Sequence, residues 1–140
     1  MLDNDSARLR SYGLLILRVV VGVTFIAHAY LKFGRIGMEG TTSFMTNLGV
    51  PAPALAAWFS VLAETFGGIA LILGIFTLPF GLALVVDMIG AIMYGKRGGG
   101  FFVPRGSELE LNLLAASLAL ALTGPGGLSL RNALRGRRPG

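Results

Sequence analysis

The sequence contains no cysteine and only one histidine. The lack of cysteine excludes disulfides, thiol chemistry, iron–sulfur clusters and thiolate metal sites. A single histidine cannot supply a bis-histidine haem, copper or zinc site. The three glycines at 98–100 lack the Lys and the Ser or Thr of a phosphate-binding loop. We therefore expect no metal, haem or nucleotide site in this chain.

Charged residues are also scarce. They make up 14% of the 140 residues, about half the usual share of a soluble domain, whereas hydrophobic residues make up 54%. A small soluble protein needs more polar surface than this to face water. The composition therefore predicts a single integral membrane domain over residues 1–140.

Four apolar runs, at residues 12–31, 53–73, 79–94 and 108–123, are each close to the ~20 residues that cross a bilayer. They are apolar on nearly all faces, unlike helices of a soluble bundle. Arg8 and Arg10 followed by Ala27-His28-Ala29 resemble a signal peptide, but Arg18 interrupts the apolar region and favours a retained helix. Gly34, Gly37 and Gly40 are expected to open a loop. The prediction is an all-α, four-transmembrane-helix antiparallel bundle.

The basic residues predict how the bundle sits in the cell membrane. With four spans, both termini and the turn near Gly74 share one side, which holds six Lys or Arg against five on the other. The positive-inside rule then favours cytoplasmic termini. The basic tail at 131–140 is expected to attract anionic lipid headgroups. No groove-reading motif accompanies the positive charge, so nucleic acid is not an expected partner.

Each of the first three runs carries an ionisable residue on a face of small residues, where membrane helices pack closely. Arg18, Glu64 and Asp87 come out about 9–14 Å deep when counted from the terminal side of each run at the helical rise. We therefore predict a buried charge network of these three residues. The alternative is that the charges only fix helix packing and register.

A second group of ionisable residues lies near the opposite membrane face: His28, Lys32 and Glu108. In the fourth run, Glu108 shares a predicted face with Asn112, Ala115 and Ala119. Charged groups at such depth are candidate sites by default. The alternative is that Lys32 reaches the interface and Glu108 caps its helix.

Taken together, these residues resemble the DoxX family of small four-helix membrane proteins. The resemblance runs from about Leu14 to Leu130. It rests on the order and spacing of its elements: the segment LRVVVGVTFIAHAYLKF, LGVPAP at 48–53, ETFGG at 64–68, Met88 with Ala91, Phe101-Phe102, Gly106 with Glu108, and Gly124-Pro125-Gly126. The sequence departs from the family at Ala29, at Lys96-Arg97 where the family often has His, and at Arg131 where it often ends in Asp.

The resemblance implies similarity to the small subunit of a thiosulfate:quinone oxidoreductase or to membrane complexes of oxidative-stress defence. Carried over position by position, it implies functional roles for a set of five residues: Arg18, His28, Lys32, Glu64 and Glu108.

The leading hypothesis is a redox-associated membrane subunit that binds a quinone or similar amphiphile within the bundle. His28, Lys32, Glu64 and Glu108 are the candidate binding residues, with His28 and Lys32 bonding a carbonyl oxygen and Glu64 relaying protons. Glu64 and His28 are the catalytic candidates if the chain itself is catalytic. A partner subunit would then carry the electrons. The alternatives are a non-enzymatic membrane scaffold and a small-solute or proton-coupled carrier, for which a homo-oligomer is expected.

Overall fold

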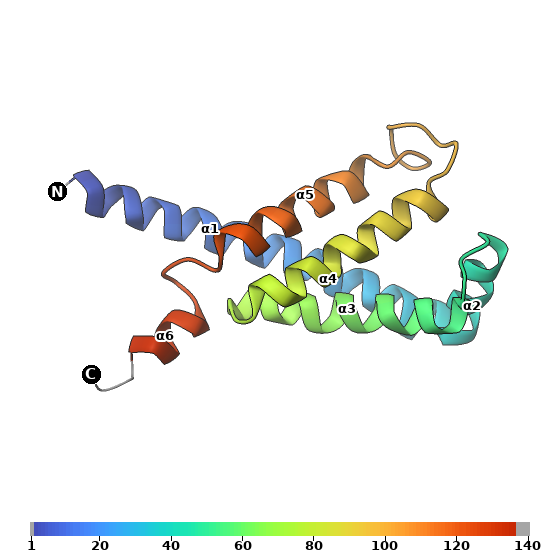
Figure 1. Ribbon diagram of the computed structural model, residues 1–140, viewed down its shortest axis with the longest axis horizontal. Helices are drawn as coiled ribbons and strands as arrows, with labels where there is room; N and C mark the ends of the chain where they lie inside the picture. The colour runs from blue at the N-terminus through green and yellow to red at the C-terminus, as the bar shows by residue number, and fades with distance from the viewer. Residues whose placement is uncertain (1, 137–140) are drawn as a thin grey trace.

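A computed structural model describes residues 2–136, and these residues form helices and loops without any strand (Figure 1). The predicted basic tail is therefore described only as far as Gly136, and Arg137 and Arg138 lie outside the described residues. The elements in chain order are α1 (Leu2–Tyr30), the π-helix η1 (Leu31–Ile36), α2 (Gly37–Asn47), α3 (Pro53–Leu73), α4 (Thr77–Gly90), the π-helix η2 (Ala91–Gly95), α5 (Glu108–Thr123) and α6 (Leu130–Gly136).

The four predicted helices are all present. The runs at 53–73 and 108–123 coincide with α3 and α5, and the other two lie within α1–η1 and α4–η2. Three helical segments are long and apolar enough to cross a membrane: Asp3–Asn47, Pro53–Leu73 and Thr77–Gly95. The fourth, α5, has 16 residues and is shorter, as its sequence indicated. The start of α1 and helix α6 lie at the same end of the bundle as the α3–α4 turn (Figure 1), as the antiparallel arrangement requires.

The predicted loop after the first helix is wrong. Residues 34–47 are helical, with η1 continuing α1 and α2 following at an angle. Only Gly37 needs a glycine's conformational freedom, because its φ is +81°. The Thr41 hydroxyl donates a hydrogen bond of 2.9 Å to the Lys32 carbonyl and so holds α2 against η1. The three spaced glycines therefore change the direction of the helix at Gly37 and do not produce a loop.

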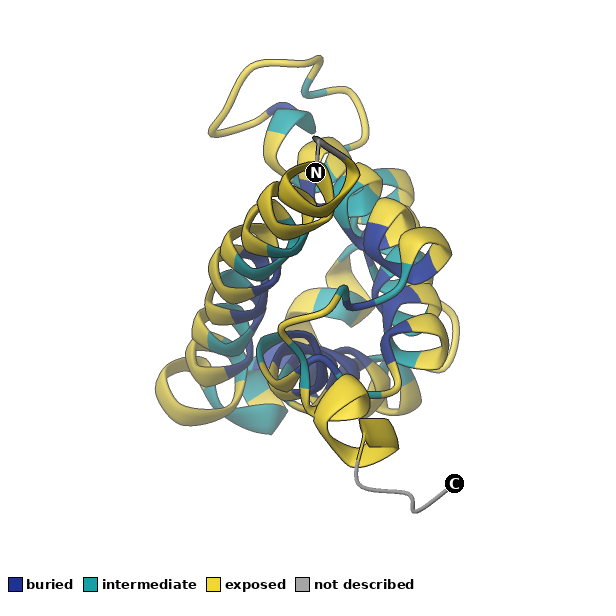
Figure 2. Ribbon diagram, turned by 90° about the vertical axis from the view of Figure 1, so that its left-hand side faces the viewer, coloured by how far each residue is buried: buried dark blue, intermediate teal, exposed yellow. Residues whose placement is uncertain are grey.

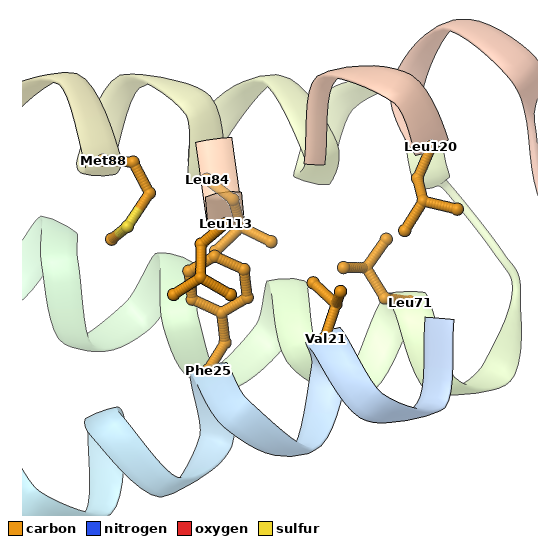
Figure 3. Packing of buried hydrophobic residues seen from close by; sticks show 7 residues of the cluster. All are labelled: Val21, Phe25, Leu71, Leu84, Met88, Leu113 and Leu120. Carbon is orange, nitrogen blue, oxygen red and sulfur yellow. The ribbon is translucent and has the colours of Figure 1, made fainter. Parts of the chain in front are cut away.

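The interior of the bundle is apolar, and the buried faces of the helices point toward it (Figure 2). One hydrophobic cluster joins α1, α3, α4 and α5, and its buried members are Val21, Phe25, Leu71, Leu84, Met88, Leu113 and Leu120 (Figure 3). Large apolar side chains also point outward, such as Leu55 and Leu122, which are 74% and 73% exposed. Such surfaces suit lipid as the surrounding solvent.

Helices α1 and α3 meet at a pair of glycines. A Cβ atom on Gly22 would lie 2.6 Å from the Gly68 carbonyl oxygen, and one on Gly68 would lie 2.7 Å from that of Gly22. Larger side chains would force the helices apart, as at other small-residue contacts in membrane proteins. Because the helices are antiparallel, this contact places Arg18 level with the C-terminal end of α3 and Lys32 beside its N-terminal half.

Candidate functional site

The centre of the site is an ion pair between Lys32 and Glu64. Lys32 Nζ lies 2.8 Å from Glu64 Oε1 and also donates to Ser60 Oγ at 2.7 Å. The Glu64 side chain is fully buried and that of Lys32 is 26% exposed. Ser60 and Glu64 are one turn apart on the buried face of α3, so one ammonium group reaches both. The α1–α3 register thus gives this buried carboxylate its cation.

Asp87 of α4 adds a second carboxyl group next to the first. It lies close enough to Glu64 for the charges of the two carboxyl groups to interact. Glu64 Oε2 and Asp87 Oδ2 are both shielded from solvent and lack a hydrogen-bond donor among the described residues. Two ionised carboxylates cannot satisfy each other, whereas one proton held between them would serve both. The pair is therefore arranged to accept a proton.

The outer part of the site is a second ion pair. Lys96, which follows η2, places Nζ 3.5 Å from Glu110 Oε1, with side chains 23% and 12% exposed. Lys96 also donates to the Pro104 carbonyl at 2.9 Å. Glu110 Oε2 is a third carboxylate oxygen that is buried without a donor in the described part of the chain.

His28 lies near both ion pairs. It is half-buried and interacts electrostatically with Lys32, Asp87, Lys96 and Glu110. A neutral imidazole can donate a hydrogen bond from one nitrogen and accept one at the other. His28 therefore adds a donor and an acceptor to the neighbourhood of both pairs.

We call the set of six side chains from α1–η1, α3, α4–η2 and α5 the ionisable cluster: His28, Lys32, Glu64, Asp87, Lys96 and Glu110. With His28 neutral, two cations face three carboxylates, so uptake of one proton makes the cluster neutral. Three carboxylate oxygens without donors mark a site that can receive a proton or a ligand's hydrogen-bond donor.

Two π-helices border the cluster. Lys32 lies within η1, and η2 runs from Ala91 to Gly95 between Asp87 and Lys96. The wider π turn changes the direction of the following side chains relative to an α-helix. Such segments occur often at functional sites. Here they connect the helices of the membrane core to the two lysines that face the carboxylates.

The predicted charge network of Arg18, Glu64 and Asp87 is wrong for Arg18. Its side chain is fully buried, but Nη1 donates to the Pro125 carbonyl at 2.9 Å and Nη2 to the Leu128 carbonyl at 2.7 Å. In the α1–α3 register, Arg18 is level with the end of α3, roughly two turns from Glu64, or about 12 Å along the helix. The depth estimate failed because it counted from the ends of the apolar runs, whereas the Gly22–Gly68 contact sets the level of α1 against α3.

The fourth predicted helix has the right bounds but the wrong inward face. Asn112, Ala115 and Ala119 are exposed, whereas Leu113, Ser117 and Leu120 are buried. Glu108 makes no side-chain hydrogen bond or ion pair within residues 2–136, and Glu110 on the buried side takes its predicted place. The sequence held one signal for this, since Ser117 lies seven residues after Glu110 and so shares its face.

Of the other three predicted faces, those on α1–η1 and α3 are largely found in the structure. On α1–η1 the stripe that includes Gly22, Phe25 and Ala29 is buried, and on α3 the stripe from Ala57 to Gly68 is buried. His28, Lys32, Glu64 and Asp87 are therefore brought together at one end of the bundle. Lys96 was predicted only as part of the loop above them.

Comparison with known proteins gives a consistent result. The sequence model of the DoxX family matches residues 13–97. The chain is 32% identical over 135 residues to the inner membrane protein YphA of Escherichia coli (strain K12), covering 90% of this chain and 93% of YphA. It is 36% identical over 118 residues, 84% of each chain, to a Bacillus subtilis (strain 168) protein named "Putative oxidoreductase CatD". It is also 28% identical over 136 residues to the membrane protein Rv3486 of Mycobacterium tuberculosis, covering 89% and 83% of the two chains. No solved structure matches the chain.

Proposed function

Because this chain belongs to the DoxX family of multi-pass membrane proteins, we propose that it is a redox-associated membrane subunit whose ionisable cluster binds a quinone or similar amphiphile. The name of one relative, an oxidoreductase, supports the redox association. The observation that carries the proposal is the cluster itself. It places hydrogen-bond donors and proton acceptors from four helices at the end of an apolar core.

The residues fit a quinone by their chemistry. A quinone is apolar except for its carbonyl oxygens, and it takes up two electrons and two protons on reduction. Lys32 and His28 can donate hydrogen bonds to a carbonyl oxygen, since both lie on the accessible side of the cluster. The Glu64–Asp87 pair can hold and release a proton beside them. Phe25, one turn before His28, and Met88, next to Asp87 in the sequence, belong to the buried hydrophobic cluster and so bring the apolar core close to these groups.

The electrons must come from elsewhere under this proposal. The sequence has no cysteine and one histidine, so a partner subunit carrying a redox centre is expected. Proton exchange with solvent would run from Glu64 through His28 to the more exposed Lys96–Glu110 pair.

The test is binding of a short-chain quinone to the detergent-purified protein. We expect Glu64→Gln to weaken binding by roughly 10-fold or more, because it removes the ionised acceptor that positions Lys32, one of the two proposed donors to the quinone, and a hydrogen bond to an ionised group is worth about 1.5–3 kcal/mol. Glu108→Gln is the matched control, since it removes the same charge at the same end of the bundle outside the cluster. Equal quinone affinity in Glu64→Gln and the wild type would refute the role of Glu64.

A non-enzymatic scaffold remains the second candidate, and the bonds of Arg18 to two backbone carbonyls favour it. These bonds join α1 to the loop after α5 and have no evident use in catalysis. Mass spectrometry of lipophilic ligands extracted from the purified protein separates the redox role from the scaffold, because a copurifying quinone supports the redox role. The carrier, the remaining alternative, would be supported by proton-coupled solute flux in proteoliposomes.

We also propose that both termini are cytoplasmic, from the excess of six Lys or Arg over five. Since the chain has no cysteine, single cysteines report orientation without background. Ala133→Cys on the terminal side should resist a membrane-impermeant thiol reagent in intact cells, and the exposed Phe102→Cys on the other side should react. The reverse labelling pattern would invert the orientation.

A further inference from the structure

At the end of the bundle that holds both termini, α6 and the loop after α5 enclose a surface pocket of about 220 Å³. The segments that line it lie at the opposite end of the helices from α2 and the loop between η2 and α5 (Figure 1), which border the ionisable cluster. Its lining residues are Thr123, Gly124, Pro125, Gly126, Ser129, Arg131, Asn132 and Arg135. None of them is acidic, so the charge of the lining is entirely positive.

The two arginines of the lining are available to a ligand. Arg131 and Arg135 are one turn apart on α6, and both are exposed. Neither guanidinium group has a hydrogen bond or an ion pair within the part of the chain that the structure describes. A Cβ on Gly124 would lie 3.5 Å from Arg131 Nη1, in ordinary van der Waals contact, so the Arg131 guanidinium lies beside this part of the lining.

A third cation lies behind the pocket wall. Pro125 lines the pocket, and its carbonyl is also the acceptor for buried Arg18. Arg18 has no carboxylate partner among residues 2–136, and its Nε is buried without an acceptor. Its charge is therefore balanced only by carbonyl dipoles, which leaves a positive field at this end of the bundle.

The surroundings of the pocket are those of a membrane interface. The apolar helix α5 ends at Thr123, one residue after Leu122, whose side chain is 73% exposed. On α6, Leu130 and Leu134 are also exposed, at 38% and 50%, beside the two arginines. A short helix with apolar and basic side chains next to each other suits the boundary between headgroups and acyl chains.

We propose that this pocket binds the headgroup of an anionic phospholipid. Its phosphodiester takes charge-assisted hydrogen bonds from Arg131 and Arg135, while its acyl chains lie along Leu122 and Leu134. The phosphate also supplies the missing counter-charge for Arg18. The site is independent of the ionisable cluster and of the quinone proposal.

The test is native mass spectrometry of the detergent-solubilised full chain with phosphatidylglycerol or phosphatidylcholine. We expect phosphatidylglycerol to bind preferentially. The R131Q/R135Q variant should lose roughly 30-fold in its affinity, at about a factor of five for each basic residue. The matched control is R8Q/R10Q, which removes the same charge from the same end outside the pocket and should retain the affinity. R131K/R135K should retain part of it and excludes a general folding defect.

Three results would overturn the proposal. The first is equal loss in R131Q/R135Q and R8Q/R10Q, which would mean a diffuse charge effect. The second is equal binding of phosphatidylcholine. The third is displacement of phosphatidylglycerol by inorganic phosphate at the same concentration, which would mean a small-anion site rather than a lipid site.

Discussion

The two ends of this bundle stabilise a buried charge in different ways. At the terminal end, Arg18 is fully buried and bound by two backbone carbonyls, which cannot change their protonation. At the other end, buried Glu64 has a lysine, a serine and a second carboxyl group around it, and several carboxylate oxygens lack donors. The first arrangement has a fixed protonation state and holds α1 to the loop after α5. The second retains capacity for a proton or ligand, which is why we place the function there.

The largest expected loss of stability is at the terminal end of the bundle. Arg18→Ala should lower the free energy of unfolding by about 3–5 kcal/mol, because it leaves the Pro125 and Leu128 carbonyls unpaired and removes a fully buried side chain. Reversible unfolding in mild detergent would measure this loss. The exposed Arg10→Ala serves as the control and should unfold like the wild type. If both variants unfold alike, Arg18 does not fasten the terminal end.

A smaller loss is expected at the ionisable cluster. Lys32→Met should cost about 2–4 kcal/mol, since it leaves Glu64 buried without its cation, although 26% exposure of Lys32 moderates the effect. The double variant Lys32→Met/Glu64→Gln should recover part of that loss, because the unpaired charge is gone. A double-mutant cycle by detergent unfolding gives the coupling. Strict additivity of the two single changes would contradict a direct pair.

The smallest effect is expected at the outer pair. Lys96→Gln should change the stability by less than about 1 kcal/mol, because its 3.5 Å separation from Glu110 is longer and Glu110 is 12% exposed, whereas Glu64 is fully buried. The same unfolding measurement, repeated at high salt, should abolish even this difference. A loss as large as that of Lys32→Met would show that the outer pair is as well shielded as the inner one.

Much of the fold could be predicted because length and apolar composition define membrane helices directly. The inward faces of α1 and α3 were also predictable, since Gly22, Gly68 and Ser60 mark them as close-packed. The depth of Arg18 was not, because it depends on where two glycines of different helices meet rather than on either apolar run. The helical continuation through Gly34 and Gly40 was likewise hidden by glycines that elsewhere mark loops.

The face of α5 was the hardest to predict. This helix is apolar around most of its circumference, so its sequence offers no single polar stripe to separate lipid from interior. Glu110 shares a face with Ser117 and Glu108 shares one with Asn112, so the pattern allows two inward faces and packing against Lys96 decides between them. Glu110, which was not predicted as a site residue, is therefore identified only by its contact with Lys96 on a different segment of the chain.

The close contact between Gly22 and Gly68 fixes one point of α1 against α3. Arg18 lies four residues from this point and Lys32 ten residues from it in the other direction, or about 6 Å and 15 Å along the helix axis. A rocking motion of α1 about the glycines would displace the lysine roughly 2.5 times as far as the arginine. Any rotation of α1 about this contact would therefore break the bonds of Lys32 to Ser60 and Glu64 before those of Arg18 to the Pro125 and Leu128 carbonyls.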